Sequence, residues 1–308
     1  MEKTEVAIIG GGPGGLAAAI YCRRYELDVI IFDIYLGGTI MKTDIIENYP
    51  GFKEINGFEL AKRIEEHALS YSPKVVSYLV DKIEKRGKSF ILTAGGKEYE
   101  AKAVILATGT KWKKLGVKGE DEFSGKGVNY CAICDAQLYK GKKVVFVGAG
   151  NSAAKDALML SDIVEKVYII SRKTFHPEPI NLAKVKKKKN IELIENTQIK
   201  EIIGDRKVSS VKLDKPYKGK DFIEVSGVFV DIGREPITQL AKILGVKLND
   251  KSEVITDSLM RTNIAGFFAI GDIREIPIKQ AIIATGDGAI AAYSAHDYIK
   301  NAEVSTYG

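Results

Sequence analysis

The sequence predicts an α/β fold built from two parallel-sheet units. The first observation is an ordered series at residues 6–33: an apolar β-branched run, a glycine-rich turn, a helical stretch and a second apolar run. The second is the return of that series at residues 144–171. The third is length, because 308 residues exceed what one hydrophobic core usually supports. Together they favour two domains of similar build.

The first unit begins with a strand expected at residues 6–9, which ends in the glycine-rich turn 10–15. A helix is expected at 16–24 and a second strand at 29–32, and Asp33 follows that strand directly. Strand, glycine turn, helix, strand and acid stand in the order that a Rossmann-type dinucleotide-binding βαβ unit requires. The alternative is a glycine turn without a ligand, and the complete series argues against it.

Each glycine of this turn has a physical role. Gly10 permits the tight turn, Gly12 lets the backbone approach a pyrophosphate, and Gly15 lets helix and strand pack closely. The helix N-terminus then faces the phosphates. Asp33 is placed to accept hydrogen bonds from a ribose 2′-hydroxyl, and its charge would repel a 2′-phosphate. This site therefore suits FAD or NAD.

Further strands are expected between the two units and near the end of the chain. Residues 75–100 alternate as an antiparallel β excursion does, and residues 98–109 predict a buried strand that leads into a glycine turn. Residues 266–272 predict a strand that stops at Gly-Asp, and a long helix is expected from 279 to 300. All of these elements suit an α/β protein.

The second unit repeats the first at a constant offset. Strands are expected at 144–147 and 167–170, with a helix between them that ends near 161. The turn residues expected to hold a nucleotide are Gly148, Gly150, Asn151, Ser152 and Ala153.

The two units differ after their second strands. The second unit carries Ser171, Arg172 and Lys173 where the first carries Asp33. A hydroxyl and two cations would tolerate or favour a 2′-phosphate, so this site leans towards NADP. The alternative is that Arg172 and Lys173 are solvated loop charges.

Cys131 and Cys134 lie three positions apart, and Asp135 follows them. Such a pair can close a small disulfide ring, and the helix-forming residues after it would place thiols at a helix N-terminus, where the reactive thiolate is stabilised. The alternatives are a buried structural pair or half of a zinc site. Zinc needs four ligands, and the remaining cysteine and the histidines do not stand at ligand spacing, so a redox pair is favoured and no metal is expected.

Composition excludes several classes of protein. The net charge of +6 is mild and does not indicate nucleic-acid binding, and the lysine run 186–189 is interpreted as a solvated helix end. No uncharged apolar stretch is long enough to span a bilayer. Three cysteines do not make a disulfide framework, which favours a cytoplasmic redox pair. Cys22 is interpreted as a packing residue.

Together these residues resemble the low-molecular-weight thioredoxin reductase family over essentially the whole chain. The most specific match is Cys-Ala-Ile-Cys-Asp at 131–135, close to the family's Cys-Ala-Thr-Cys-Asp and, as in the family, just before the second glycine turn. Further matches are Gly37-Gly38-Thr39, Glu47-Asn48-Tyr49-Pro50-Gly51, Ala107-Thr108-Gly109, Gly271-Asp272 and Lys279-Gln280-Ala281.

The resemblance implies two Rossmann-like, three-layer (ββα) dinucleotide-binding domains, the second inserted into the first. Residues 1–110 and 236–308 would form the FAD-binding domain, and residues 111–235 the nicotinamide-nucleotide domain with the redox pair. A homodimer is implied as well. The residues implied to bind FAD are Gly10, Gly12, Pro13, Gly15, Asp33, Gly38, Thr39, Asn48, Thr108, Gly109, Gly271, Asp272, Lys279, Gln280 and Ala281.

The resemblance also implies a relay of electrons. Hydride would pass from NADPH to the flavin, and the reduced flavin would open the Cys131–Cys134 disulfide. The dithiol would then reduce the disulfide of thioredoxin or a thioredoxin-like protein, with Cys131 attacking the partner, Cys134 contacting the flavin and Asp135 moving the proton. Asp135 could instead be an acid that stabilises the first turn of a helix. Because the pair must meet both flavin and partner, the second domain is expected to rotate about linkers near 110–111 and 233–236.

The sequence departs from the family at one signature. The family's His-Arg-Arg, followed by a further arginine, is replaced by Ser-Arg-Lys-Thr-Phe-His at 171–176. Lysine lacks the guanidinium fork, and His176 would be a weak, pH-dependent cation. NADH, ferredoxin or a deazaflavin are therefore alternative donors. A ferredoxin–NADP reductase-like flavoprotein would lack the cysteine pair, and a nucleotide-sensing scaffold would not need it.

Overall fold

The computed structural model describes residues 1–43 and 45–304, and for residues 42, 45, 133, 134 and 302–304 it describes the backbone only. The chain divides into two compact units. Unit 1 is formed by residues 1–111 together with the segment that starts at Glu235, and unit 2 by Trp112–Arg234.

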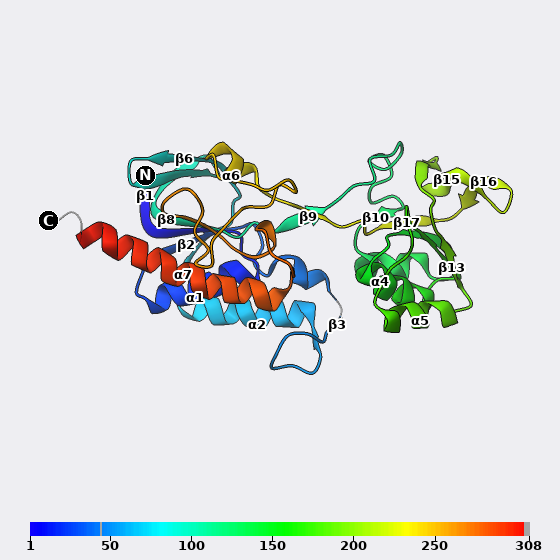
Figure 1. Ribbon diagram of the computed structural model, residues 1–308, viewed down its shortest axis with the longest axis horizontal. Helices are drawn as coiled ribbons and strands as arrows, with labels where there is room; N and C mark the ends of the chain where they lie inside the picture. Colours follow the sequence, from blue (N-terminus) through cyan, green and yellow to red (C-terminus); the bar gives the residue numbers. More distant parts are fainter. Residues whose placement is uncertain (44, 305–308) are drawn as a thin grey trace. The chain divides into compact units, whose positions relative to one another are not determined.

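Unit 1 is built on a parallel sheet in which the central strand is β1 (Figure 1). Strand β1 pairs with β2 on one side and with β8 on the other, β5 extends the sheet beyond β2, and β19 pairs with the end of β8. All of these pairs are parallel, as two βαβ units require. The strands are β1 (Glu2–Ile9), β2 (Val29–Phe32), β5 (Lys74–Val76), β8 (Lys97–Leu106) and β19 (Phe267–Ala269).

The predicted antiparallel excursion is present as β6 (Val80–Arg86) and β7 (Ser89–Ala94), which pair with each other and with the first half of β8. The expectation was too long at its start, because residues 75 and 76 belong to the parallel strand β5. The strand expected within residues 98–109 is present as β8, which runs unbroken from the hairpin into the buried sheet.

Alternation along β1 explains the layers of unit 1. Val6 and Ile8 face one core with α1 and α7, whereas Ala7 and Ile9 face the other core with β6 and β7. A strand whose two faces are both covered needs apolar residues at successive positions, which is the pattern of this run. The sheet therefore lies between a helical layer and a β layer, and the predicted α/β class is confirmed.

The helices of unit 1 begin slightly away from the predicted positions. The first starts at Pro13, because proline is favoured at the first helical position, where its missing N–H is not needed. The C-terminal helix starts at Ala281. The elements are α1 (Pro13–Arg24), α2 (Gly57–Ser70), α6 (Gln239–Ile243) and α7 (Ala281–Val304), the 3-10 turns η1 (Gly38–Lys42) and η3 (Gly271–Ile273), and the short pair β3 (Ile45–Ile46) and β4 (Ile55–Asn56).

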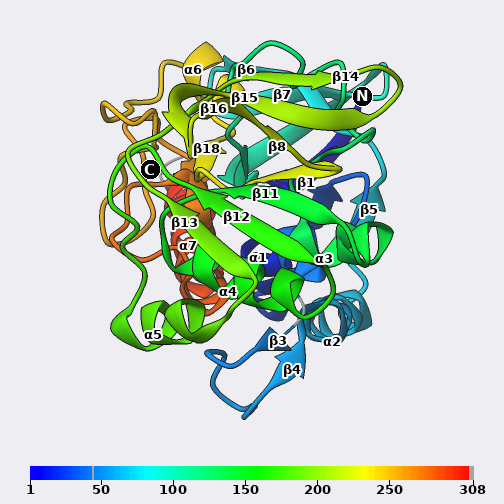
Figure 2. The same ribbon diagram turned by 90° about the vertical axis from the view of Figure 1, so that its right-hand side faces the viewer.

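Unit 2 repeats the arrangement with a five-stranded, wholly parallel sheet in the order β10-β17-β11-β12-β13. Figure 2 shows β11, β12 and β13 side by side. One face of this sheet packs on an antiparallel three-stranded sheet, and the other on α4 and α5. The strands are β10 (Val128–Asn129), β11 (Lys143–Val147), β12 (Lys166–Ile170), β13 (Ile191–Ile194), β14 (Ile199–Gly204), β15 (Val208–Tyr217), β16 (Lys220–Glu224) and β17 (Gly227–Val230).

The helices of unit 2 are short. They are α3 (Ala132–Asp135), the 3-10 turn η2 (Ala136–Tyr139), α4 (Asn151–Ser161) and α5 (Pro179–Lys187). Helix α5 carries three lysines in its last turn, which suits the helix dipole and agrees with the interpretation of the lysine run.

The chain crosses between the units twice, and the two crossings pair. Strand β9 (Thr110–Trp112) forms a two-stranded sheet with β18 (Arg234–Pro236). The Arg234 guanidinium lies over the Trp112 ring at 4.4 Å from its centroid. Both crossings fall at the linkers expected from the sequence.

Candidate functional site

The first glycine turn lies at the carboxyl end of β1, where ligands bind in open parallel sheets. Gly10 has φ +111°, and a Cβ on it would lie 2.3 Å from the Ala107 carbonyl oxygen. A Cβ on Gly15 would lie 1.9 Å from the Gly10 carbonyl oxygen. At Gly12 the nearest such contact is 3.7 Å away, at Gly38. Gly10 and Gly15 are thus required by the turn itself, whereas Gly12 keeps its surface open for close approach of a ligand.

Asp33 is held in place by this turn. Its carboxylate Oδ2 accepts a hydrogen bond of 2.6 Å from the Gly11 amide, and Gly11 in turn accepts one from the Gly37 amide. The acid at the end of β2 and the segment that opens η1 are therefore fixed against the same turn. Gly38 has φ +67°, and half-buried Thr39 follows it in η1.

Residues far apart in the sequence meet on this side of unit 1. The Asn48 amide donates to the Gln280 side-chain oxygen over 2.9 Å, although 232 residues separate them. Helix α7 starts one residue later, at Ala281, so this pair stands at its N-terminus. The Thr108 hydroxyl donates to the Ile237 carbonyl over 2.8 Å, and Gly109 has φ +63°.

The segment after β19 is braced by an acid that the sequence reasoning missed. Asp287, 4% exposed, accepts a hydrogen bond from the Gly271 amide over 2.9 Å and two from the Arg274 guanidinium, one from Nε and one from Nη2, each over 2.7 Å. Lys279 donates to the Asp272 carbonyl over 2.6 Å. A lone acid within the apolar stretch 281–292 was the available signal for Asp287.

The second glycine turn is formed in the same way at the end of β11. A Cβ on Gly148 would lie 2.7 Å from both the Ala153 methyl and the Asp231 carbonyl oxygen, whereas no atom lies within 4 Å of one on Gly150. Asn151 is the first residue of α4 and Ser152 is exposed. The open side of this turn thus lies at Gly150, at the N-terminus of a helix.

The loop after β12 differs from the expectation at one residue. Ser171 is 2% exposed, and its hydroxyl donates to the Lys173 carbonyl over 2.7 Å. Arg172 and Lys173 are exposed. The His176 amide donates to the Ala149 carbonyl over 2.9 Å, which ties this loop to the glycine turn. Both cations are exposed, as a phosphate-binding pair or a pair of solvated loop charges would be, and the serine hydroxyl is bonded within the loop.

The cysteine segment lies at the start of α3. Cys131 directly precedes this helix and takes part in a disulfide bond, as expected of a redox cysteine. The side chain of Cys134 lies outside the described part of the structure. Asp135 is the last residue of α3 and is half-buried. The helix is only four residues long and passes into η2, so the segment is a short helical turn.

Other candidate groups do not contribute to these sites. Cys22 is a free, buried thiol in α1, and burial raises its pKa to about 12, as suits a packing residue. Among residues 1–43 and 45–304, no group of three His, Cys, Asp or Glu side chains is placed to hold a metal ion. None of the described helices combines the length and apolar character needed to cross a bilayer.

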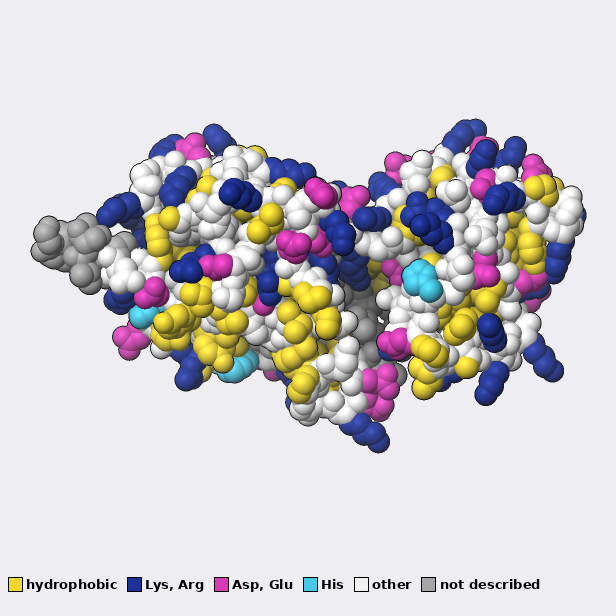
Figure 3. All heavy atoms as spheres, in the orientation of Figure 1, with side chains coloured by type: hydrophobic (Ala, Val, Ile, Leu, Met, Phe, Trp, Pro, Cys, Tyr) yellow, Lys and Arg dark blue, Asp and Glu magenta, His cyan; other side chains and the backbone are white. Residues whose placement is uncertain are grey.

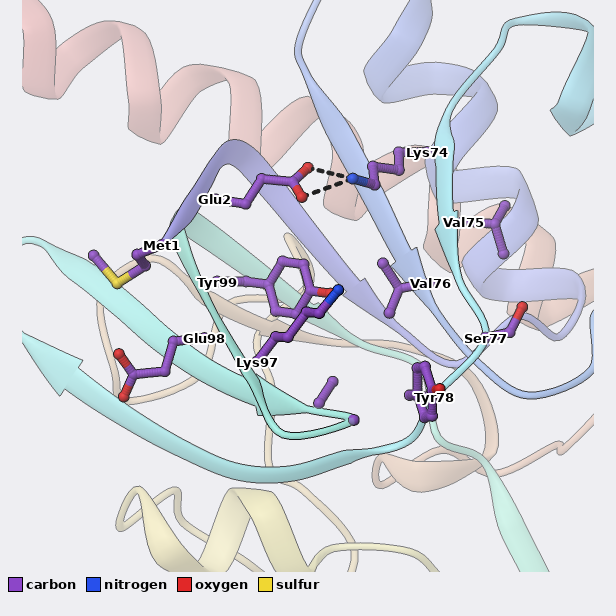
Figure 4. A pocket seen from close by; sticks show the side chains of 12 residues that line it. Met1, Glu2, Lys74, Val75, Val76, Ser77, Tyr78, Lys97, Glu98 and Tyr99 are labelled. Carbon is purple, nitrogen blue, oxygen red and sulfur yellow. Dashed lines mark hydrogen bonds and ion pairs between the residues drawn. The ribbon is translucent and has the colours of Figure 1, made fainter.

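One cavity of about 640 Å³ lies elsewhere in unit 1 (Figure 4). It is lined by the amino end of β1, by β5 and the two residues that follow it, and by the turn between β7 and β8, and the Glu2–Lys74 ion pair of 2.6 Å borders it. None of the residues that line this cavity belongs to the glycine turn or to the other residues of the candidate dinucleotide site.

Three comparisons bear on what this arrangement does. The family model of the pyridine nucleotide-disulphide oxidoreductases matches residues 4–290. The chain is 38% identical to the thioredoxin reductase of Listeria innocua over 96% of this chain and 94% of that protein. The crystal structure of Lactococcus lactis thioredoxin reductase, 33% identical, superposes with a TM-score of 0.91 and covers 97% of this chain and 99% of that one. The crystal structure of T. acidophilum thioredoxin reductase, 40% identical, superposes with a TM-score of 0.88 and covers 96% of this chain and 99% of that one.

Proposed function

The chain belongs to the pyridine nucleotide-disulphide oxidoreductase family, and on that premise we propose that it carries electrons from a reduced nicotinamide dinucleotide through FAD and a Cys131–Cys134 disulfide to a thioredoxin-like protein. It is a thioredoxin reductase by its likeness to relatives that match over nearly their full length. One observation supports this electron path most directly: the same chain contains two glycine turns that are open to a ligand and a disulfide-bonded Cys131.

We assign FAD to unit 1, because its residues fit such a group. The cradle is the surface at Gly12, which lacks a side chain and faces Gly38. Pro13 starts α1 there, so the helix N-terminus would meet the pyrophosphate and Asp33 the adenosine ribose. When bound, FAD supplies the two-electron link between a hydride donor and a disulfide.

The residues proposed to bind the flavin ring lie around the N-terminus of α7. Gln280 and Ala281 would face the pyrimidine end of the ring, where the positive end of the helix stabilises negative charge. Asn48, bonded to Gln280, would hold that side, together with Thr39. The remaining residues proposed to line the group are Gly10, Gly15, Thr108, Gly109, Gly271, Asp272 and Lys279.

We assign the nicotinamide nucleotide to unit 2. Gly150 leaves the backbone open at the start of α4, and Asn151, Ser152 and Ala153 follow it. Because the Ser171 hydroxyl is directed to its own loop, selection of a 2′-phosphate would fall to Arg172 and Lys173. Two exposed cations, and a serine at the position where unit 1 has Asp33, make NADPH the donor that we favour over NADH. The second candidate is the same disulfide reductase with another donor, such as ferredoxin or a deazaflavin, since only one arginine stands there.

Transfer to the partner is a thiol–disulfide exchange. The Cys131 thiolate forms a bond to one sulfur of the partner's disulfide while that disulfide breaks, and the electron pair leaves on the second partner sulfur. Asp135 would protonate that leaving thiolate. Cys134 then attacks the mixed disulfide, which releases the reduced partner and restores the Cys131–Cys134 bond.

A single fixed arrangement cannot bring the pair to both flavin and partner. We therefore propose that the β9 and β18 crossings act as a hinge for the rotation of unit 2, the inserted domain. Disulfide locking of the units is expected to stop turnover with a protein substrate.

We also propose a homodimer formed through unit 1, in a cytoplasmic protein. Apolar side chains gather over α1 and α7 (Figure 3). Tyr21 and Tyr25, in and directly after α1, and Ile290 and Tyr293 of α7 are more than one third exposed. A cluster of large exposed apolar side chains is typical of a surface that another protein covers. Sedimentation velocity tests this proposal, and a monomer at micromolar concentration would contradict it.

Anaerobic titration of the flavin-loaded protein tests the function. NADPH is expected to bleach the flavin absorbance faster than NADH, and added thioredoxin to restore it. The variant with serine at both Cys131 and Cys134 is expected to bleach normally but to leave thioredoxin oxidised. Bleaching by neither nucleotide, with bleaching by reduced ferredoxin, would favour the second candidate. Reduction of thioredoxin by the double variant would overturn the electron path.

A further inference from the structure

A buried carboxylate lies beside the segment that carries Cys131, and the residues proposed above do not include it. Glu120 is 2% exposed, although charged side chains are seldom buried so completely. Removing a carboxylate from water is costly unless hydrogen bonds replace its hydration. The groups that donate hydrogen bonds to Glu120 therefore indicate the role of this buried carboxylate.

Three donors bind this carboxylate. The Tyr130 hydroxyl and the Leu115 amide each donate to Oε1 over 2.8 Å. The Gly116 amide donates to Oε2 over 2.7 Å. Hydrogen bonds to a charged acceptor are stronger than neutral ones and fix geometry more tightly. One carboxylate thus binds two segments at once. The first is the Leu115–Gly116 turn, which follows β9, and the second is Tyr130, the residue directly before Cys131.

The bond from Tyr130 persists over the whole physiological range of pH. Burial, and then the bond to Glu120, raise the pKa of the Tyr130 phenol well above its ordinary value. The phenol therefore stays protonated and remains a donor wherever a thiolate can form. Strand β10 ends one residue earlier, so Tyr130 is the only residue between this sheet and Cys131.

A second buried bond spans the cysteine segment. Asn129, 6% exposed, donates to the Tyr139 hydroxyl over 2.9 Å, and Tyr139, 7% exposed, closes η2. The backbone is thereby held on both sides of residues 131–135. Of these two hydrogen bonds, the one from Tyr130 to Glu120 restrains the residue adjacent to Cys131.

We propose that Glu120 is a positioning residue for Cys131: by binding Tyr130 and the Leu115–Gly116 turn on one carboxylate, it fixes the backbone from which the attacking sulfur projects. The inference rests on the proposed function, in which Cys131 attacks a disulfide. Such attack needs the thiolate in line with the bond that breaks, so small displacements reduce its rate strongly.

Two variants separate the parts of this arrangement. Tyr130→Phe removes one hydrogen bond and keeps the charge of Glu120 and both amide bonds. Glu120→Gln keeps the size of the side chain but removes the charge and turns one acceptor into a donor. Matched controls are Glu122→Gln, an exposed acid in the same loop, and Tyr217→Phe in β15.

The experiment compares three rates on the flavin-loaded protein. The first is the rate of flavin reduction by NADPH. The second is the rate at which the pre-reduced protein reduces a disulfide in a single turnover, with dithiobis(nitrobenzoate) and with thioredoxin as substrates. The third is the rate of alkylation of Cys131 by iodoacetamide, with the modified residue identified by mass spectrometry. A small alkylating reagent can approach from many directions, whereas disulfide attack requires alignment. Tyr130→Phe and Glu120→Gln are expected to slow disulfide reduction about tenfold, the effect of one charge-assisted hydrogen bond, with flavin reduction and alkylation unchanged.

Other outcomes would overturn the inference. Disulfide reduction at the wild-type rate in Tyr130→Phe, or a parallel loss of all three rates with a lower melting temperature, would mean that Glu120 serves only the stability of unit 2. If the wild-type protein reduces the aromatic disulfide but not thioredoxin, the proposed partner is wrong, while the ratio of disulfide attack to alkylation still tests the role of Glu120.

Discussion

Asp156→Asn is expected to stabilise unit 2 at neutral and alkaline pH. Asp156 lies on α4, near Asp231, which directly follows β17. Burial, and then the charge of Asp231, raise the pKa of the Asp156 carboxyl from 3.8 to about 7, although Arg234 opposes the shift. Burial also raises the pKa of Asp231. The folded unit therefore keeps a proton that the unfolded chain loses.

The sign and the size of the effect follow from this difference. Because the folded state binds more protons than the unfolded state, the stability of unit 2 falls as the pH rises from about 4 to about 7, and it is constant above that range. A rise of about 3 pKa units corresponds to a ceiling of about 4 kcal/mol at 1.36 kcal/mol each. Asparagine cannot ionise, so the variant lacks this decline.

Native-state hydrogen exchange measures the effect, because amides in β11 and β17 report the opening free energy of the unit that contains Asp156. The difference in free energy between the variant and the wild type is expected to grow by at most about 3 kcal/mol between pH 5 and pH 8, after correction for intrinsic exchange. The control is Asp205→Asn, an exposed acid between β14 and β15. A difference that does not change with pH would refute the reasoning.

Four further variants test the proposed sites and their supports. Replacing both Arg172 and Lys173 by alanine is expected to raise KM for NADPH about tenfold or more and to leave KM for NADH unchanged, because only NADPH carries the 2′-phosphate. Steady-state kinetics measures both constants. Equal changes in the two KM values would mean that the cations are only solvated loop charges. Asp287→Asn is expected to destabilise unit 1 by about 3 kcal/mol, because it removes the buried charge that pairs with the largely buried Arg274 guanidinium. Urea unfolding monitored by flavin release measures this effect, and an unchanged midpoint would contradict it. Gly15→Ala is expected to prevent folding, because its methyl would lie 1.9 Å from a carbonyl oxygen, and circular dichroism would show this. Gly12→Ala is expected to fold but to bind FAD weakly, which the flavin-to-protein absorbance ratio measures. Full FAD content in Gly12→Ala would mean that Gly12 is not part of the FAD site.

Local signals in the sequence predicted the repeated units well. The apolar run at 6–9 and the glycines after it are neighbours along the chain, so strand, turn and helix could be recognised from short windows. The thioredoxin reductase resemblance is confirmed by relatives that match over nearly the whole chain. Element ends were less predictable, since a proline at the start of α1 extended it by one turn.

Contacts that depend on tertiary structure could not be predicted in this way. The Asn48–Gln280 bond joins residues 232 positions apart, and no periodicity links them. Ser171 was expected to offer its hydroxyl to a ligand, but the local path of the chain brings the Lys173 carbonyl within 2.7 Å of it. Glu120 stands in a charged, loop-like stretch, where an acid is ordinarily solvated, and only the fold shows that it is buried.

The two glycine turns show how one pattern tolerates different residues. In unit 1 the turn needs φ +111° at Gly10, and the space between Gly10 and Gly15 holds no Cβ atom at all. In unit 2 the corresponding space already contains the Ala153 methyl, which would lie 2.7 Å from a Cβ on Gly148. One methyl therefore fits between turn and helix in unit 2, provided that its partner is glycine. The turn of unit 2 thus accommodates alanine at the third position, and no atom lies within 4 Å of a Cβ on Gly150. The second unit can therefore depart from the glycine pattern and keep the open backbone that a nucleotide needs.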